Sequence, residues 1–197
     1  GRAGGEGGPV GWGWGARRAA PWADDRFCLV NGDTPCGVAR RALFAAHLAR
    51  SARVTLAVTP NPAPQRYGGV LTDTDGWVRG FARAGDPRNP AHFVGVQIVD
   101  AAVFETLRDG DPAASIGGLY DTLLAHAGHV AVHHVVGHFR DIGTTADYLE
   151  TTREVAADEG RPTVFVGLRS VVHPSARLER SVLWDDVTVG AGCIVTD

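Results

Sequence analysis

The sequence contains no lysine and no methionine, so all 19 basic residues of the 197-residue chain are arginines. A phosphate loop that ends in Gly-Lys-Ser/Thr is therefore excluded. No segment approaches the roughly 18 uninterrupted apolar residues of a transmembrane helix, and no basic region followed by an apolar stretch opens the chain. Because the net charge of −3 comes from mixed signs, we expect neither nucleic acid nor a membrane as a partner.

Cysteine is also scarce. The chain has Cys28, Cys36 and Cys193, an odd number without any Cys-x-x-Cys spacing, which argues against a disulfide framework or a structural zinc site. Four histidines between residues 129 and 138 do not supply a zinc site instead, because that segment is predicted as a strand, on which neighbouring side chains point to opposite faces. The sequence therefore favours a protein of the reducing cytoplasm.

Residues 1–25 are rich in glycine, and we expect this segment to be poorly ordered because glycine loses much backbone entropy on ordering. From residue 26 the composition changes to apolar runs and to segments with apolar residues at helical spacing. The expected strands are 27–30 (buried), 54–58, 92–99 and 130–136, the expected helices are 38–51, 119–127 and 145–157, and an Asp-Gly turn at 73–76 predicts a hairpin. The strand–helix–strand order predicts an α/β sheet with a parallel crossover.

The last part of the chain has a different pattern. From residue 171 to 197, small or apolar side chains recur with a period of six residues and one slip. Short repeats of this kind build a parallel β-helix, in which each turn buries its face against its neighbours. We therefore expect a domain over residues 26–158, a linker over residues 159–170 and the start of a β-helix over residues 171–197.

Two aspartates follow predicted strands at glycine-containing turns. Asp33 comes after the first strand, beside Gly32, and Asp141 precedes Gly143. Ligands bind at the carboxyl ends of strands in open α/β sheets, and Mg²⁺ prefers one or two carboxylates together with substrate oxygens. The same aspartates also suit ordinary turns that cap the following helices, and their spacing alone does not decide between the two interpretations.

Five short segments occur in an order that resembles one enzyme family. They are Phe27–Thr34, Arg66–Val70, Val78–Phe81, Phe93–Gln97 and Phe139–Thr144, the last followed by Asp147–Leu149. Together with the hexapeptide tail they resemble the sugar-1-phosphate nucleotidyltransferases, nearest the mannose-1-phosphate guanylyltransferase-like branch. The resemblance covers about residues 16 to 197.

This resemblance implies a partial Rossmann-like nucleotidyltransferase sheet, followed by a left-handed parallel β-helix of hexapeptide repeats. It also implies the transfer of a nucleotidyl group from a nucleoside triphosphate to a sugar 1-phosphate, which gives an NDP-sugar and pyrophosphate. Asp33 and Asp141 match the aspartates that hold Mg²⁺ in this family. The positions that match its substrate pocket are Asn31, Gly32, Gly68 and Gly95.

The chain departs from the family near its beginning. The Gly-x-Gly-x-Arg loop and the lysine that grip the triphosphate are absent, and Ala82-Arg83 replaces a common Glu-Lys pair. We therefore expect an N-terminally incomplete chain that does not turn over by itself, with Arg17 and Arg18 as the only nearby cations. The alternative is a non-catalytic regulatory or scaffold paralogue of the same fold. A hexapeptide acyltransferase is disfavoured because the repeats are few, and assembly into a homo-oligomer through the β-helix stays open.

Overall fold

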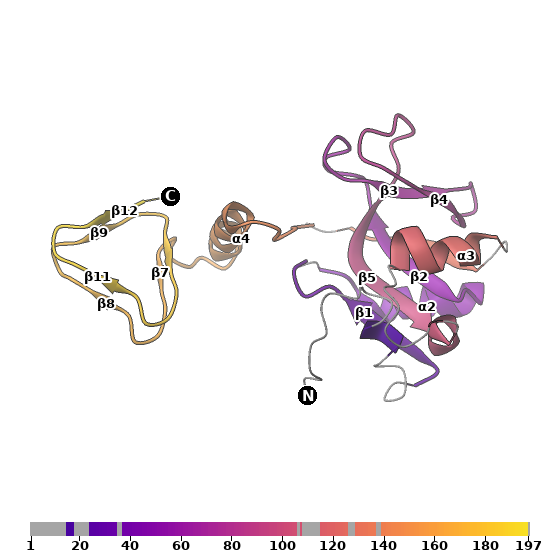
Figure 1. The fold of residues 1–197 in the computed structure, drawn as a ribbon, viewed down its shortest axis with the longest axis horizontal. Helices are drawn as coiled ribbons and strands as arrows, with labels where there is room; N and C mark the ends of the chain where they lie inside the picture. The colour runs from indigo at the N-terminus through magenta and orange to yellow at the C-terminus, as the bar shows by residue number, and fades with distance from the viewer. Residues whose placement is uncertain are drawn as a thin grey trace. The chain divides into compact units, whose positions relative to one another are not determined.

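The computed structural model describes residues 15–17, 24–34, 37–105, 107, 115–125, 129–136 and 139–196 (Figure 1). Most of the glycine-rich segment over residues 1–25, including Arg18, lies outside the described residues, and so does Cys36. The chain divides into two compact units, Gly1–Phe139 and Arg140–Asp197. No helix in the described parts of the chain combines the length and the apolar character needed to cross a membrane.

The first unit is built on a four-stranded sheet with the order β1-β5-β2-β6. Its strands are β1 (Arg26–Val30), β2 (Val54–Thr59), β5 (His92–Asp100) and β6 (Val130–His134). Apolar and β-branched residues dominate all four segments, as expected for strands that are buried on one or both faces. The four predicted strands are therefore confirmed, with ends that differ by no more than two residues.

The sheet is mixed rather than parallel. β5 pairs antiparallel with both β1 and β2, whereas β2 pairs parallel with β6. The connection from β1 through a helix to β2 therefore joins two strands of the same direction that are separated by β5. Among the described strands β1 lies at the sheet edge, and Cys28 and Val30 are exposed. The prediction of a buried first strand is wrong, because β1 has a strand neighbour on one side only.

Helices cover both faces of the sheet. They are α2 (Arg40–Arg50) on one face, and η2 (Ala101–Phe104), the π-helical η3 (Ser115–Leu119) and α3 (Tyr120–Leu124) on the other. Leu43 of α2 clusters with Ala57 of β2, while the preceding and following residues of β2, Leu56 and Val58, join the cluster that contains Phe104. Successive side chains of β2 thus fill two separate cores.

Hydrogen bonds satisfy buried polar side chains at two places in this unit. The Tyr120 hydroxyl donates to Gln97 Oε1 at 2.8 Å, and both side chains are almost completely buried. His47 of α2 is also buried, with Nδ1 2.9 Å from Thr55 Oγ1 and Nε2 3.3 Å from Asp100 Oδ1. Because an unsatisfied buried polar group is costly, these contacts restrict how α2 and α3 can sit on the sheet.

The predicted hairpin is present as β3 (Gly69–Thr72) and β4 (Val78–Ala82), which pair antiparallel. The Asp73 side chain accepts the backbone N–H of Trp77 at 2.8 Å, and Gly76 has a φ of +79°. Aspartate and glycine therefore play the parts in this turn that the sequence pattern predicts.

The second unit begins with α4 (Thr145–Asp158), which confirms the helix expected at 145–157. Thr144 Oγ1 accepts the backbone N–H of Asp147 at 3.1 Å and donates to the carboxylate of the same residue at 2.8 Å. This reciprocal pairing resembles a capping box and satisfies a backbone donor that the helix itself cannot pair.

Six two-residue strands follow α4. They are β7 (Phe165–Val166), β8 (Val171–Val172), β9 (Arg177–Leu178), β10 (Val182–Leu183), β11 (Thr188–Val189) and β12 (Ile194–Val195). β7 pairs with β10, β8 with β11 and β9 with β12, always in parallel and with partners 17 residues apart. The three ladders lie on the three sides of a triangular course (Figure 1). β7 lies within residues 159–170, so the paired segment begins earlier than the sequence period indicates.

Candidate functional site

Asn31, Gly32 and Asp33 follow β1 directly. They lie at the end of the sheet where β1, β2 and β6 terminate, because these three strands run in the same direction. β5 runs the opposite way, so its first residues reach the same edge, and His92 pairs with Thr59 at the end of β2. Loops at this edge form the ligand sites of open α/β sheets.

Asn31 and Gly95 are in direct contact at this edge. The backbone N–H of Asn31 donates to the carbonyl oxygen of Gly95 at 2.8 Å. Gly95 lies in an irregular part of β5 and has a φ of +75°, a conformation that is unfavourable for residues with a Cβ. A Cβ at this position would lie only 2.8 Å from Cγ of Asn31. Backbone conformation and close approach therefore both require glycine here.

A cavity of about 270 Å³ opens beside this pair. Its lining consists of Val30, Asn31, Gly32, Thr34, Val38, Arg40 and Val96. Asn31 and Gly32 are predicted site residues, but Arg40, the first residue of α2, is not. Nothing in the sequence distinguishes Arg40 from the other arginines, because only the approach of α2 to the end of β1 brings it to the cavity.

Asp33 is exposed at the same edge, and Thr34 Oγ1 donates to its Oδ1 at 3.1 Å. Thr34 is only 6% exposed, so the hydroxyl that orients the carboxylate is itself held in place. Ala39 is the N-cap of α2, and no side chain caps that helix. The interpretation of Asp33 as a helix cap is therefore excluded.

Asp141 lies at the start of the second unit. Its side chain is half-buried, and its Oδ2 would lie 3.9 Å from a Cβ built on Gly143, with an oxygen of Asp147 at 3.7 Å. Because Thr144 caps α4, Asp141 does not have that role either. Asp33 and Asp141 belong to different units, and their convergence on one ion stays a prediction.

Gly68 has a packing role beside the hairpin. A Cβ at this position would lie 2.4 Å from the carbonyl oxygen of Ala82, so only glycine lets the two backbones approach. Asn61 holds the same loop, because its Nδ2 donates to the carbonyl oxygen of Tyr67 at 3.1 Å and its Oδ1 accepts the N–H of Ala63 at 3.1 Å. Asn61 is flanked by prolines, a pattern that predicts a turn but not this anchoring contact.

An aromatic cluster stands next to this loop. The His92 ring centroid lies 4.8 Å from that of Tyr67 and 4.2 Å from that of Phe139. Tyr67 and Phe139 meet edge to face at 5.9 Å. These rings come from three distant parts of the chain. Their contacts hold Phe139, the last residue of the first unit, against Tyr67 and His92.

Arg17, one of the two cations expected near the triphosphate, lies elsewhere. Its guanidinium donates to the carbonyl oxygens of Phe104 and Glu105, both at 3.4 Å. These carbonyls follow the carboxyl end of β5, whereas the candidate site lies at the amino end of that strand. Arg17 therefore does not serve the candidate site in this structure.

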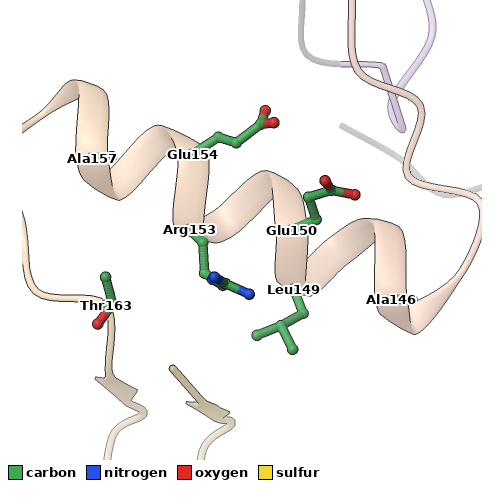
Figure 2. A pocket seen from close by; sticks show the side chains of 7 residues that line it. All are labelled: Ala146, Leu149, Glu150, Arg153, Glu154, Ala157 and Thr163. Atoms are coloured by element: carbon green, nitrogen blue, oxygen red, sulfur yellow. The ribbon is translucent and has the colours of Figure 1, made fainter. Parts of the chain in front are cut away.

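The second unit has a groove of its own, with a volume of about 520 Å³. It is lined by Ala146, Leu149, Glu150, Arg153, Glu154 and Ala157 of α4, and by Thr163. Figure 2 shows Leu149 and Arg153 on the side of α4 that faces the Thr163 segment, with Glu154 directed away from it. None of the predicted site residues lines this groove.

No protein-family model matches the chain. Three curated proteins of similar sequence are sugar-1-phosphate nucleotidyltransferases by name. Mannose-1-phosphate guanylyltransferase of Mycobacterium tuberculosis is 24% identical over 95% of this chain and 60% of its own length. Glucose-1-phosphate adenylyltransferase of Thermomicrobium roseum is 26% identical over 85% of this chain and 42% of its own length. Glucose-1-phosphate thymidylyltransferase of Streptomyces antibioticus is 29% identical over 68% of this chain and 41% of its own length. The chain thus spans between about two fifths and three fifths of these relatives.

Solved structures agree on the fold. HddC from Yersinia pseudotuberculosis, in complex with GMP-PN, matches 74% of this chain and 62% of its own with a TM-score of 0.61 and 22% identity. A putative glucose-1-phosphate thymidylyltransferase from Bacillus anthracis, in complex with a sucrose, matches 75% of this chain and 61% of its own. The TM-score is 0.62 and the identity is 16%. The relatives in sequence and in fold therefore confirm the resemblance that the ordered sequence motifs predict.

Proposed function

We propose that this chain takes part in the transfer of a nucleotidyl group from a nucleoside triphosphate to a sugar 1-phosphate. A phosphate oxygen of the sugar phosphate attacks the α-phosphorus, the bond from that phosphorus to the β-phosphate oxygen breaks, and pyrophosphate leaves. The observation that carries this proposal is the contact of Asn31 with Gly95 at the carboxyl edge of the sheet. Asn31, which this contact holds, lines a cavity at the edge where open α/β sheets bind ligands.

The residues of this edge would act by holding the substrates in position. The Asn31 side chain and the backbone at Gly32 offer hydrogen-bonding groups to a sugar or nucleotide, while Gly95 holds Asn31 through its carbonyl and Gly68 keeps the neighbouring loop close to the hairpin. Orientation of two reactants in this way lowers the barrier by replacing a bimolecular encounter with a unimolecular step. No side chain needs to form a covalent bond with the substrate.

Mg²⁺ fits the carboxylates available. Among the described residues no group of three His, Cys, Asp or Glu side chains is arranged to hold a metal ion. Mg²⁺ does not need such a group, because one or two carboxylates suffice where phosphates and water supply the other oxygens. Asp33, exposed and oriented by Thr34, would be one such ligand, and Asp141 is the second carboxylate that we propose for this role. When bound, the ion would neutralise negative charge that develops on the phosphates.

The pair of substrates to test first is GTP with mannose 1-phosphate, because the relative that matches 95% of this chain is named mannose-1-phosphate guanylyltransferase. We further propose that the second unit forms turns of a left-handed β-helix, which the parallel pairing of strands 17 residues apart supports. We also expect the 197-residue chain to show no turnover by itself, because it carries neither the glycine-rich loop nor a lysine that would grip the triphosphate.

Calorimetric titration of the chain with sugar nucleotides tests this function independently of turnover. GDP-mannose, ADP-glucose and dTDP-glucose are compared in the presence of Mg²⁺, and we expect at least one of them to bind. Gly95→Ala should abolish this binding, whereas Gly80→Ala should not, because a Cβ at residue 80 meets only Leu71 Cδ1 at 3.8 Å. The absence of binding by any of the three ligands to the folded chain would overturn the proposal.

Pyrophosphate release provides the second arm. The chain is incubated with Mg²⁺, each nucleoside triphosphate and either mannose 1-phosphate or glucose 1-phosphate, and we expect no release. Asp33-dependent release would support the nucleotidyl transfer but contradict the expected inactivity of the isolated chain. Binding without any response to Mg²⁺ or to substitution of Asp33 would favour a non-catalytic paralogue.

A further inference from the structure

Unlike most of the arginines that the structure describes, Arg40 has no partner among the described residues. Arg26, Arg79 and Arg88, for example, each form an ion pair with an aspartate at 2.9 Å or less. The Arg40 guanidinium has no ion pair or hydrogen bond within the part of the chain that the structure describes, although the residue lines the cavity at the end of β1. A guanidinium that stands at a cavity with all five N–H donors uncommitted is available to a ligand.

Asn31 presents a second uncommitted group to the same cavity. Its backbone N–H pairs with Gly95, but its side-chain amide has no hydrogen-bond partner among the described residues. The residue is only half-exposed, and its side chain is held against Gly95. The contact with Gly95 therefore limits the positions that the amide can take at the cavity.

The charges at the start of α2 are unfavourable for the protein alone. Arg40 and Arg41 place two cations in the first turn, which contains no acidic residue, and no side chain caps the helix. The helix dipole makes its N-terminus positive, so cations are destabilising there and anions stabilising. Arg41 is exposed but does not line the cavity, which makes it a matched reference for Arg40.

We propose that Arg40 binds a phosphate group in this cavity, with the Asn31 amide as a second donor. The inference rests on the proposed function, for which every substrate and product carries phosphate. Arginine suits this task because its planar fork matches two phosphate oxygens, and the chain has no lysine to take that part. With about 270 Å³ the cavity is smaller than the roughly 300–1,000 Å³ typical of sites for whole ligands. It therefore takes one charged group of a ligand rather than an entire sugar nucleotide.

The test compares Arg40→Gln with Arg41→Gln, which remove the same charge from adjacent positions of one helix. Each variant of the full chain is titrated with pyrophosphate, mannose 1-phosphate, GDP-mannose and uncharged mannose. We expect Arg40→Gln to weaken the binding of at least one phosphate-bearing ligand about tenfold or more, as befits a hydrogen bond to a charged group. Arg41→Gln should change the dissociation constants less than about threefold, the effect of one exposed charge, and the response to mannose should not change in either variant.

Different failures are distinguishable. If sugar nucleotides bind equally well to the wild type and to Arg40→Gln, the assignment of Arg40 is wrong while the proposed function stands. If pyrophosphate binding depends on Arg40 but no sugar phosphate or sugar nucleotide binds, the anion site stands and the proposed function fails. Equal losses in Arg40→Gln and Arg41→Gln would show a general charge effect and would also overturn the assignment.

Thermal unfolding without ligand separates binding from folding. Both glutamine variants should unfold at the same temperature as the wild type or slightly higher, because each removes a cation from the positive end of a helix. If Arg40→Gln nevertheless fails to fold, Arg40→Lys is used, which keeps the charge but loses the fork. It should bind pyrophosphate more weakly than the wild type, and unchanged affinity would refute the proposed fork.

Discussion

Asn31 and Gly95 lie against each other, with the Asn31 N–H bonded to the Gly95 carbonyl and no room between them for a Cβ. Asn31 directly follows β1, which is an edge strand. Gly95 lies in an irregular part of β5, the strand that pairs with β1. The contact joins the edge strand to the centre of the sheet at the point where the candidate cavity opens.

Gly95→Ala should lower the free energy of unfolding of the first unit by about 2–4 kcal/mol. The left-handed backbone accounts for about 1–2 kcal/mol of this, and the forced displacement of Asn31 accounts for the rest. Urea denaturation of the variant and of Gly80→Ala measures the difference. Asn31→Gly in the Gly95→Ala background should restore part of the loss, since it removes the atoms that clash. A loss for Gly95→Ala no larger than that for Gly80→Ala would contradict the contact.

Asp33→Asn and Asp141→Asn should each remove the effect of Mg²⁺ on ligand binding. In the wild type we expect Mg²⁺ to tighten the binding of a sugar nucleotide about tenfold, the magnitude of one charged interaction. Titration with and without Mg²⁺ measures this ratio, and exposed Asp75 provides the control substitution Asp75→Asn. A ratio that is unchanged in Asp33→Asn would reject Asp33 as a metal ligand.

Stability should decrease as the pH falls below about 6.5, and His47 should be a cause. Burial lowers the pKa of His47 below its ordinary value of 6.5, although the hydrogen bond to Asp100 opposes this. Above pH 6.5 the ring is neutral in the folded and the unfolded chain, so its contribution is constant. As the pH falls, the unfolded chain takes up a proton first, and the free energy of unfolding decreases by at most about 1.4 kcal/mol per pH unit.

The measurement is urea denaturation at several pH values between 8 and 5, for the wild type and for His47→Gln. The difference between the two chains should be constant near pH 8 and should change below pH 6.5. A difference that stays constant over the whole range would exclude His47 as the titrating group.

Tyr120→Phe should destabilise the first unit by about 1–3 kcal/mol, because it leaves the buried Gln97 Oε1 without its donor. Burial raises the pKa of the Tyr120 hydroxyl well above its ordinary value, so this group stays a donor throughout the neutral range. In the Gln97→Leu background the same substitution should cost less. Urea denaturation of the four chains gives the coupling, and additive losses would show that the two groups do not depend on each other.

The elements with local signals are the ones that the sequence predicts well. The hairpin at Asp73–Gly76 follows from turn chemistry, and α4 follows from helical spacing and a polar residue at its start. The candidate site residues Asn31, Gly32, Gly68 and Gly95 are predicted from motifs, because each motif is a short continuous segment. The structural reason for glycine differs between two of these positions. A Cβ at residue 68 would collide with the backbone of Ala82, whereas a Cβ at residue 95 would collide with the side chain of Asn31.

Tertiary structure decided which segments became neighbours. Hydrophobic periodicity does not distinguish a strand at the edge of a sheet from one inside it. The sequence therefore contains no local signal that β5 lies between β1 and β2. The same holds for Arg40, which resembles every other arginine in the sequence and lines the cavity only because α2 begins beside the end of β1. The sequence alone thus determined the strands, the turns and the chemistry of the candidate ligands, because these depend on residues close in the chain. The order of the strands and the position of the cation depended on contacts between residues far apart, whose energies exist only in the folded chain.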